Sequence, residues 1–201
     1  SHDLGNRATQ EYEDARKNVA QFIGAETDEL VFTRGTTEAI NLVACTYVKD
    51  NFDTVILTEL EHHSNILPWQ LNALTIKVIP LDEDLNIDLD VYTSIVRENP
   101  DSFIAITHIS NAFGILNPVK ELIRIAHTYG CKILIDGAQA LAHVKIDVKD
   151  LDADFYAVSA HKAYGPTGVG ALYGKYALLE RMRPYQGGGS MIGDVSFESS
   201  S

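Results

Sequence analysis

The sequence predicts an α/β fold, in which a mostly parallel sheet is covered by helices on both faces. Helical and strand-like segments alternate along almost the whole chain, with no internal repeat and no low-complexity stretch. The strand segments are nearly continuous apolar runs, as expected of strands that are buried on both faces. The polar residues that suggest chemistry follow the ends of these strands, where open parallel sheets bind their ligands.

The first half of the chain begins with an amphipathic helix, predicted from about Ala8 to Ile23 and ended by Gly24. Its apolar face would carry Tyr12, Val19, Phe22 and Ile23. The elements predicted next are a strand Leu30–Thr33, a helix Thr36–Tyr47, a strand Thr54–Leu57, a helical stretch Asn65–Leu74, a strand Ile76–Ile79 and, after an acidic loop, a helix Leu89–Arg97.

The second half continues the alternation. It comprises a buried strand Phe103–Thr107, a crossover helix Val119–Tyr129 closed by Gly130, a buried strand Lys132–Ile135, and two further strands, Asp154–Ser159 and Val169–Tyr173. Only a loop separates the last two strands, which is short enough for antiparallel neighbours. The glycine-rich segment that starts at Gly187 is expected to be a flexible loop, and a sheet protein rarely finishes on one. The chain is therefore expected to be truncated.

Composition narrows the classes of function. A chain of 201 residues suffices for one domain with a substantial core. The formal net charge of -12 argues against partners that are nucleic acids or anionic membranes. No apolar run approaches the length of a membrane span, and no secretory core begins the chain. The two cysteines, Cys45 and Cys131, suggest neither a disulfide framework nor a zinc site, so we expect a cytoplasmic protein.

Two segments about 25 residues apart suggest a site for pyridoxal 5'-phosphate (PLP). Asp136 ends one apolar strand and Gln139 follows it; Ser159, His161 and Lys162 follow a later strand. PLP requires a lysine amine for its Schiff base and a carboxylate that keeps its ring nitrogen protonated. Because only a neutral amine attacks an aldehyde, we expect burial beside the cationic ring system to lower the pKa of Lys162. The alternative is a capping aspartate and an ordinary surface lysine.

The turn that contains Thr36 and Thr37 is a candidate phosphate site. It lies where a strand leads into a helix, so exposed backbone amides and two hydroxyls could bind an anion. The alternative is that Thr36 or Thr37 simply caps the helix. The segment is not a Walker loop, since the lysine and the required spacing are missing.

Histidines and an asparagine follow two other strands. His62 and His63 are adjacent, whereas helical metal ligands need a spacing of three or four, so no metal is expected. A better interpretation is a histidine that lies on an aromatic cofactor ring, with a solvated helix cap as the alternative. Asn111 could donate to a cofactor oxygen or could merely cap a turn.

Six motifs, in the order in which that family carries them, resemble class V aminotransferase-fold enzymes over essentially the whole chain. They are Phe32–Asn41, Glu61–Gln70, Thr107–Asn111, Asp136–Ala140, Ser159–Gly168 and Gly187–Ile192. The chain most resembles the group II cysteine desulfurases of the SufS type, with selenocysteine lyase as near kin. The resemblance implies that residues 1–201 are the PLP-binding large domain of a type I PLP-dependent transferase fold.

The resemblance also implies roles for individual residues. Lys162 would form the Schiff base and move the proton at the substrate α-carbon. Asp136 would pair with the pyridinium nitrogen, and Gln139 would hydrogen-bond the ring oxygen. His62 would stack on the ring and assist proton transfer, and Asn111 would contact the ring oxygen or the substrate. The implied phosphate ligands are Thr36, Thr37, Ser159 and His161.

The chain departs from the family pattern in several respects. The persulfide-forming cysteine of the family lies in an Arg-x-Gly-His-His-Cys-like segment, which is absent here, and neither Cys45 nor Cys131 matches it. The amino-terminal arm and the small carboxyl-terminal domain, which carries the arginine for the substrate carboxylate, are missing too. We therefore expect a fragment that retains a PLP site but does not complete turnover.

The implied activity is the conversion of L-cysteine to L-alanine, with sulfur passed to an enzyme cysteine for iron-sulfur cluster assembly. A homodimer and a sulfur-acceptor protein are the implied partners. Two alternatives stay open. One is another enzyme of the same fold, such as a selenocysteine lyase or another class V aminotransferase. The other is a non-catalytic scaffold that only dimerises, which would not develop a visible absorbance band with PLP.

Overall fold

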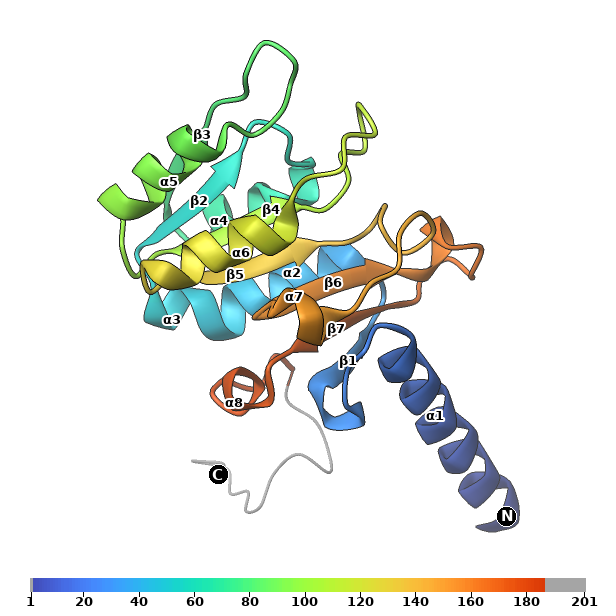
Figure 1. The fold of residues 1–201 in the computed structure, drawn as a ribbon. Coiled ribbons are helices and arrows are strands. Elements are labelled where there is room, and N and C mark those ends of the chain that lie inside the picture. Colours follow the sequence, from blue (N-terminus) through green and yellow to red (C-terminus); the bar gives the residue numbers. More distant parts are fainter. Residues whose placement is uncertain (1, 187–201) are drawn as a thin grey trace, which may run out of the picture.

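Seven strands form one mixed sheet, in a computed structural model that describes residues 2–186 (Figure 1). The strands are β1 (Leu30–Thr33), β2 (Thr54–Thr58), β3 (Thr75–Ile79), β4 (Phe103–Thr107), β5 (Lys132–Asp136), β6 (Phe155–Ser159) and β7 (Gly170–Gly174). Their order is β1-β7-β6-β5-β4-β2-β3. The run from β3 to β6 is parallel, whereas β7 is antiparallel to both β6 and β1. The predicted antiparallel pairing of β6 and β7 is confirmed.

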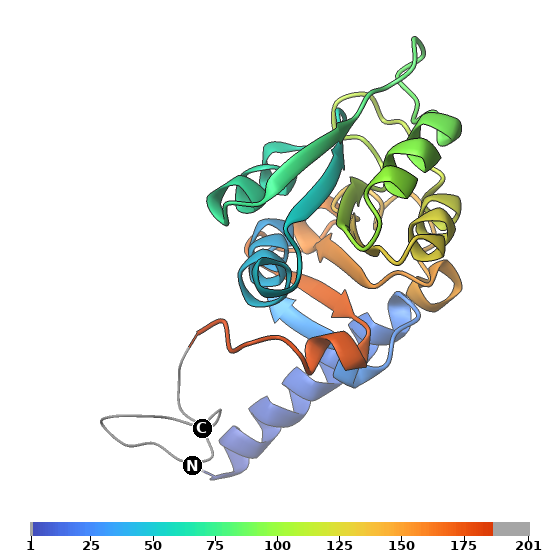
Figure 2. The ribbon, with the colours of Figure 1, turned by 90° about the vertical axis from the view of Figure 1, so that its left-hand side faces the viewer.

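Helices cover both faces of the sheet, as the alternating sequence pattern predicts (Figure 2). They are α1 (His2–Phe22), α2 (Thr36–Val43), α3 (Lys49–Asn51), α4 (Leu67–Leu71), α5 (Leu89–Glu98), α6 (Val119–Thr128), α7 (Val148–Leu151) and α8 (Tyr176–Leu179). The end of α1 packs on one face together with α5, α6 and α7, and the other face is covered by α2, α4 and α8. The α/β class and the two-sided cover are therefore confirmed.

The central strands divide their side chains between two apolar cores. In β4, Phe103 and Ala105 belong to the core under α2, whereas Ile104 and Ile106 belong to the core under α6. All five residues of β4 are buried. This arrangement explains why the strand is apolar at four consecutive positions, Phe103 to Ile106, rather than at every second one.

The first helix differs from its prediction. α1 begins at His2 rather than near Ala8, and it extends away from the sheet (Figure 1). Of the predicted apolar face, Ile23 is buried just after the helix, but Phe22 is 67% exposed and Tyr12 is half exposed. The predicted face is therefore confirmed at Val19 and Ile23, which pack on the core, and wrong at Phe22. The ring of Tyr12 packs edge-on against Phe32 of β1. None of the helices in residues 2–186 is long and apolar enough to span a membrane.

Two further helices have different bounds from those predicted. The helix expected to end at Tyr47 continues through a π-helical segment, Ala44–Val48, into α3. The stretch expected to be one helix from Asn65 to Leu74 is instead a 3₁₀ turn, His63–Asn65, followed by the short α4. Pro68 at the start of α4 has no backbone N–H, which suits the first turn of a helix and not an interior.

Candidate cofactor site

A cavity of about 740 Å³ lies at the carboxyl ends of β4, β5 and β6, beside the amino terminus of α2. The ends of the three strands contribute Thr107, Asp136 and Ser159 to its wall. All nine predicted site residues line it: Thr36, Thr37, His62, Asn111, Asp136, Gln139, Ser159, His161 and Lys162. The structure therefore brings together residues that lie on five separate segments of the chain, although their individual roles stay predictions.

The turn into α2 forms one wall of the cavity. Gly35 occupies the helix cap with φ +149°, a conformation that favours glycine, and no side chain bonds there. The alternative that Thr36 or Thr37 caps the helix is therefore wrong. Within residues 2–186 the Thr36 hydroxyl is buried and has no hydrogen-bond partner. Such an orphaned donor beside free helix amides fits an anionic group, as a phosphate would supply.

The neighbouring strands are shaped to approach this turn closely. A Cβ at Gly170, the first residue of β7, would lie 2.6 Å from the Cα of Gly35, so only glycine allows the contact. From β6, the Ser159 hydroxyl lies 2.9 Å from Nδ1 of His161. The predicted phosphate ligands of both segments thus border the same wall of the cavity.

Asp136 contributes a buried carboxylate. Its Oδ1 accepts a hydrogen bond of 3.0 Å from the backbone N–H of Ala138, which fixes the side chain at the end of β5. Burial raises the pKa of Asp136, while the Ala138 hydrogen bond and the proximity of His62 oppose this effect. A cationic ring nitrogen placed against this carboxylate would favour its ionised form.

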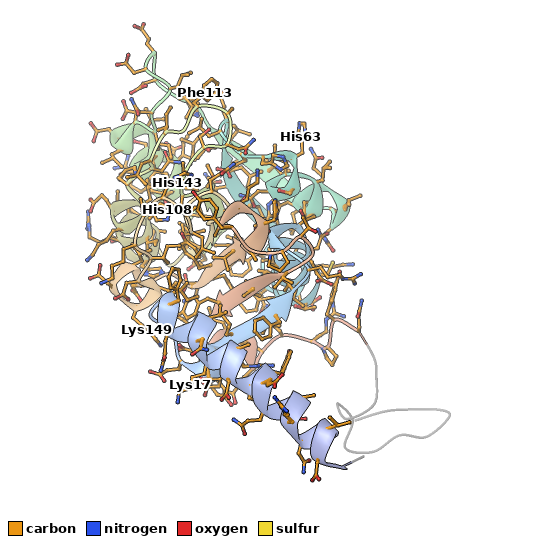
Figure 3. The ribbon with its side chains drawn as sticks, turned by 90° about the vertical axis from the view of Figure 1, so that its right-hand side faces the viewer. Lys17, His63, His108, Phe113, His143 and Lys149 are labelled. Atoms are coloured by element: carbon orange, nitrogen blue, oxygen red, sulfur yellow. The ribbon has the colours of Figure 1, made fainter. Side chains whose placement is uncertain are left out.

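His62 both caps a turn and lines the cavity. Its Nδ1 accepts the backbone N–H of Ser64 at 3.2 Å and lies 2.8 Å from the Ser64 hydroxyl. Because Nδ1 accepts, the proton of the neutral ring resides on Nε2. The two interpretations of His62, a turn cap and a cavity residue, therefore hold at once. His63, labelled in Figure 3, is exposed and does not line the cavity.

Lys162 lies in a 3₁₀ turn, Ala160–Lys162, directly after β6. Its side chain lines the cavity and is exposed, and the expected burial beside a bound cationic ring stays a prediction. Gln139 and Asn111 hydrogen-bond each other at the same cavity, which places the two predicted ring-oxygen contacts side by side.

Sequence reasoning assigned no role to several residues at this site. Arg34 lines the cavity and pairs with Glu38 at 3.2 Å; Asn41 and Tyr185 line it as well. Glu61 is buried next to the His62 turn. The position of Glu61, between a strand end and two histidines, could have identified it from the sequence as a residue near the site. Nothing in the sequence around Tyr185 indicates a site.

The two cysteines lie elsewhere. Cys131 is buried before β5, with its thiol 3.6 Å from the carbonyl oxygen of Asn99, and burial raises the pKa of that thiol. Cys45 is partly exposed within the π-helical segment. Neither lines the cavity. Of the six motifs, Gly187–Ile192 lies outside the described residues.

The fold and the residues at the carboxyl edge of the sheet match a PLP-dependent transferase fold. The chain belongs to the class-V aminotransferase family, because the family model described as aminotransferase class-V matches residues 1–201.

Two curated relatives are both named cysteine desulfurase. The protein of Dickeya dadantii is 48% identical over 203 residues, covering 97% of this chain and 49% of its own length. The protein of Synechococcus elongatus is 47% identical over 206 residues, covering 98% of this chain and 33% of its own length. The chain thus spans half or less of the length of these relatives.

Two solved structures are similar to this fold. The cysteine desulfurase CsdA of Escherichia coli superimposes with a TM-score of 0.91 at 40% identity, covering 98% of this chain and 51% of that one. An apo cysteine desulfurase of Thermococcus onnurineus gives a TM-score of 0.91 at 38% identity, with the same coverage.

Proposed function

We propose that the chain is the cofactor-binding part of a PLP-dependent cysteine desulfurase of the group II, SufS type. The observation that carries the proposal is that Asp136 and Lys162 line one cavity whose further wall is the turn at Thr36. That turn offers a buried hydroxyl without a partner, which suits a phosphate. The relatives named cysteine desulfurase support the choice of reaction.

Bound PLP would withdraw electrons from the α-carbon of an amino acid attached to it. The residues of this chain would hold and orient it. The carboxylate of Asp136 would face the ring nitrogen, and the helix amides with Thr36 and Thr37 would hold the phosphate. The amine of Lys162 would attach the cofactor and hold or release a proton at the α-carbon, while His62 would cover the ring.

The whole protein would take L-cysteine, release L-alanine and pass the sulfur to one of its own cysteines, for iron-sulfur cluster assembly. Since neither Cys45 nor Cys131 lines the cavity, we propose that this cysteine lies outside residues 1–201. We also propose that the whole protein forms a homodimer and transfers its sulfur to an acceptor protein. Residues 1–201 alone should then release no sustained sulfide from L-cysteine and a reductant.

Covalent capture of the cofactor tests the site. The purified protein is mixed with PLP, reduced with borohydride and mapped by peptide mass spectrometry. We expect a visible absorbance band that borohydride abolishes, and one added pyridoxyl phosphate group on Lys162. The variant Lys162→Ala should lose both signals. Lys17→Ala is the matched control, because Lys17 is an exposed lysine on α1 (Figure 3).

The result that would overturn the proposal is a protein that stays colourless with excess PLP, or one whose label is spread over surface lysines. Equal capture by the parent and by Lys162→Ala would contradict it in the same way. Such results would favour the scaffold interpretation.

A further inference from the structure

Glu61 is a buried carboxyl group that lies next to the cavity without lining it. Its two oxygens accept three hydrogen bonds. Oε1 accepts the hydroxyl of Thr58 at 2.7 Å and the backbone N–H of Thr107 at 3.2 Å. Oε2 accepts the side-chain amide of Asn65 at 2.7 Å.

The three donors come from three segments that border the cavity. Thr58 ends β2, Asn65 belongs to the 3₁₀ turn after His62, and Thr107 ends β4. Thr107 lines the cavity and is paired with Asp136 in the register of β4 and β5. Glu61 therefore connects the His62 turn to the strand end that adjoins Asp136.

The turn is further anchored behind Glu61. Asn65 is fully buried, and its backbone oxygen accepts the indole N–H of Trp69 at 2.8 Å. Trp69 is itself buried in the core under α2. The hydrogen-bonded chain from Trp69 through Asn65 to Glu61 thus joins the apolar core to the edge of the cavity.

Burying this carboxyl group has a cost in free energy. Burial, together with the negative charge of Asp136, raises the pKa of Glu61 to about 8, although the hydrogen bonds from Thr58 and Asn65 oppose this shift. An apolar side chain of similar size would avoid that cost. Unlike an apolar side chain, the carboxyl group has two oxygens that accept hydrogen bonds from all three segments at once.

We infer that Glu61 is a positioning residue of the site: it holds the His62 turn against the end of β4 and so sets where the His62 imidazole lies relative to Asp136. The inference deepens the proposed function and rests on it only for the identity of the bound group. Glu61 touches neither that group nor the substrate, and it acts through His62 and Thr107.

The test is the variant Glu61→Gln, which keeps the size of the side chain but turns one acceptor oxygen into a donor that faces Asn65. Two quantities are measured. One is the NMR signal of the His62 ring without cofactor, assigned with His62→Gln. The other is the dissociation constant for PLP by absorbance. We expect a displaced His62 signal and a dissociation constant larger on the order of tenfold.

A compensating double variant distinguishes a positioning role of Glu61 from a general loss of protein stability. In Glu61→Gln with Asn65→Asp, the donor and the acceptor are exchanged, so the hydrogen bond between positions 61 and 65 can form again. We expect the double variant to recover the His62 signal and most of the PLP affinity. Asn65→Asp alone removes the donor to Glu61 and, above about pH 8, where Glu61 is ionised, places two carboxylates face to face, so under those conditions it should resemble Glu61→Gln.

Asp154→Asn is the matched control. Asp154 is a fully buried carboxylate at the opposite end of β6, held by His127 at 2.8 Å and by Lys175 at 3.2 Å. We expect this variant to lower the melting temperature while the His62 signal and the PLP affinity remain within about twofold of the parent, because the site is remote.

The inference is overturned if Glu61→Gln lowers stability as Asp154→Asn does but leaves the His62 signal in place, or if the exchanged pair recovers nothing. If Glu61→Gln does not fold, Thr58→Val decides, since it removes one donor to Glu61 and should move the same signal by less. A colourless protein with a displaced His62 signal would refute the proposed cofactor and leave the role of Glu61 standing.

Discussion

The imidazole of His108 and the hydroxyl of Tyr156 form a hydrogen bond of 2.7 Å next to the turn that follows Asp136. His108 also donates its backbone N–H to the carbonyl oxygen of Asp136 at 2.8 Å. The ring of Tyr156 occupies the space that a side chain at Gly137 would need. Both side chains are buried, so this pair supports the strand end from the face opposite the cavity.

The His108 ring predicts how stability depends on pH. Burial lowers its pKa to about 4 from the ordinary 6.5. Below pH 6.5 the His108 ring is protonated in the unfolded chain, whereas in the folded protein it stays neutral until the pH falls to about 4. Stability that is fully present above pH 6.5 is therefore lost as the pH falls toward 4, by about 3 kcal/mol in all.

Denaturant unfolding of the parent and of His108→Gln at pH 7 and pH 4.5 measures this contribution. The difference between the two proteins should shrink at pH 4.5, because the variant lacks the titrating ring. An identical pH dependence for both would contradict the prediction.

Gly137→Ala should destabilise the protein. A Cβ at this position would lie 2.1 Å from Cε1 of Tyr156, so the ring or the backbone after Asp136 must shift. We expect a loss of roughly 1–3 kcal/mol in the free energy of unfolding, together with weaker PLP binding. Gly5→Ala is the control, since nothing lies within 4 Å of its added Cβ and alanine favours a helix. Equal stabilities for the two variants would refute this account.

Thr36→Val should separate stability from binding. Because the Thr36 hydroxyl is buried without a partner in residues 2–186, its replacement by a methyl group should leave stability unchanged or raise it by about 1 kcal/mol. PLP affinity should fall, since the hydroxyl is a proposed phosphate ligand. Thr46→Val provides the contrast, as it removes a hydrogen bond of 2.7 Å to Leu42 and should destabilise. Thermal unfolding measures the stability, and absorbance titration measures the PLP affinity. Destabilisation by Thr36→Val would contradict the claim that the Thr36 hydroxyl has no hydrogen-bond partner.

Asp136→Asn should change the pH dependence in the opposite sense to the His108 variant. Burial raises the pKa of Asp136, so the folded state holds this proton more tightly than the unfolded chain. Stability that is present at acid pH is lost as the pH rises through the raised pKa. The amide variant should thus gain stability relative to the parent at pH 7 more than at pH 3, and it should bind PLP more weakly. Denaturant unfolding curves of both proteins at the two pH values measure this effect. The same difference in the free energy of unfolding between parent and variant at both pH values would contradict the prediction.

Local sequence was enough to locate most strands and the residues of the site. The runs Phe103–Thr107 and Leu30–Thr33 have the predicted bounds, because a short apolar run between turn residues favours a buried strand over a helix, which needs more residues. The cavity residues were found because carboxyl ends of parallel strands meet at one edge, so polar residues that follow them converge. The helices were less predictable, since their ends depend on packing: α1 is longer than its apolar pattern and α4 is shorter.

The sequence by itself determined the α/β class, the antiparallel pairing of β6 with β7, and nine of the side chains that line the cavity. Only the tertiary structure decided the order of the strands, the exposure of Lys162, and the partners of the buried polar groups. Glu61 bonds to Thr107, 46 residues away, and His108 bonds to Tyr156, 48 residues away. Periodicity is a property of neighbours along the chain, whereas the cost of burying a polar group is set by whatever the folded chain places beside it.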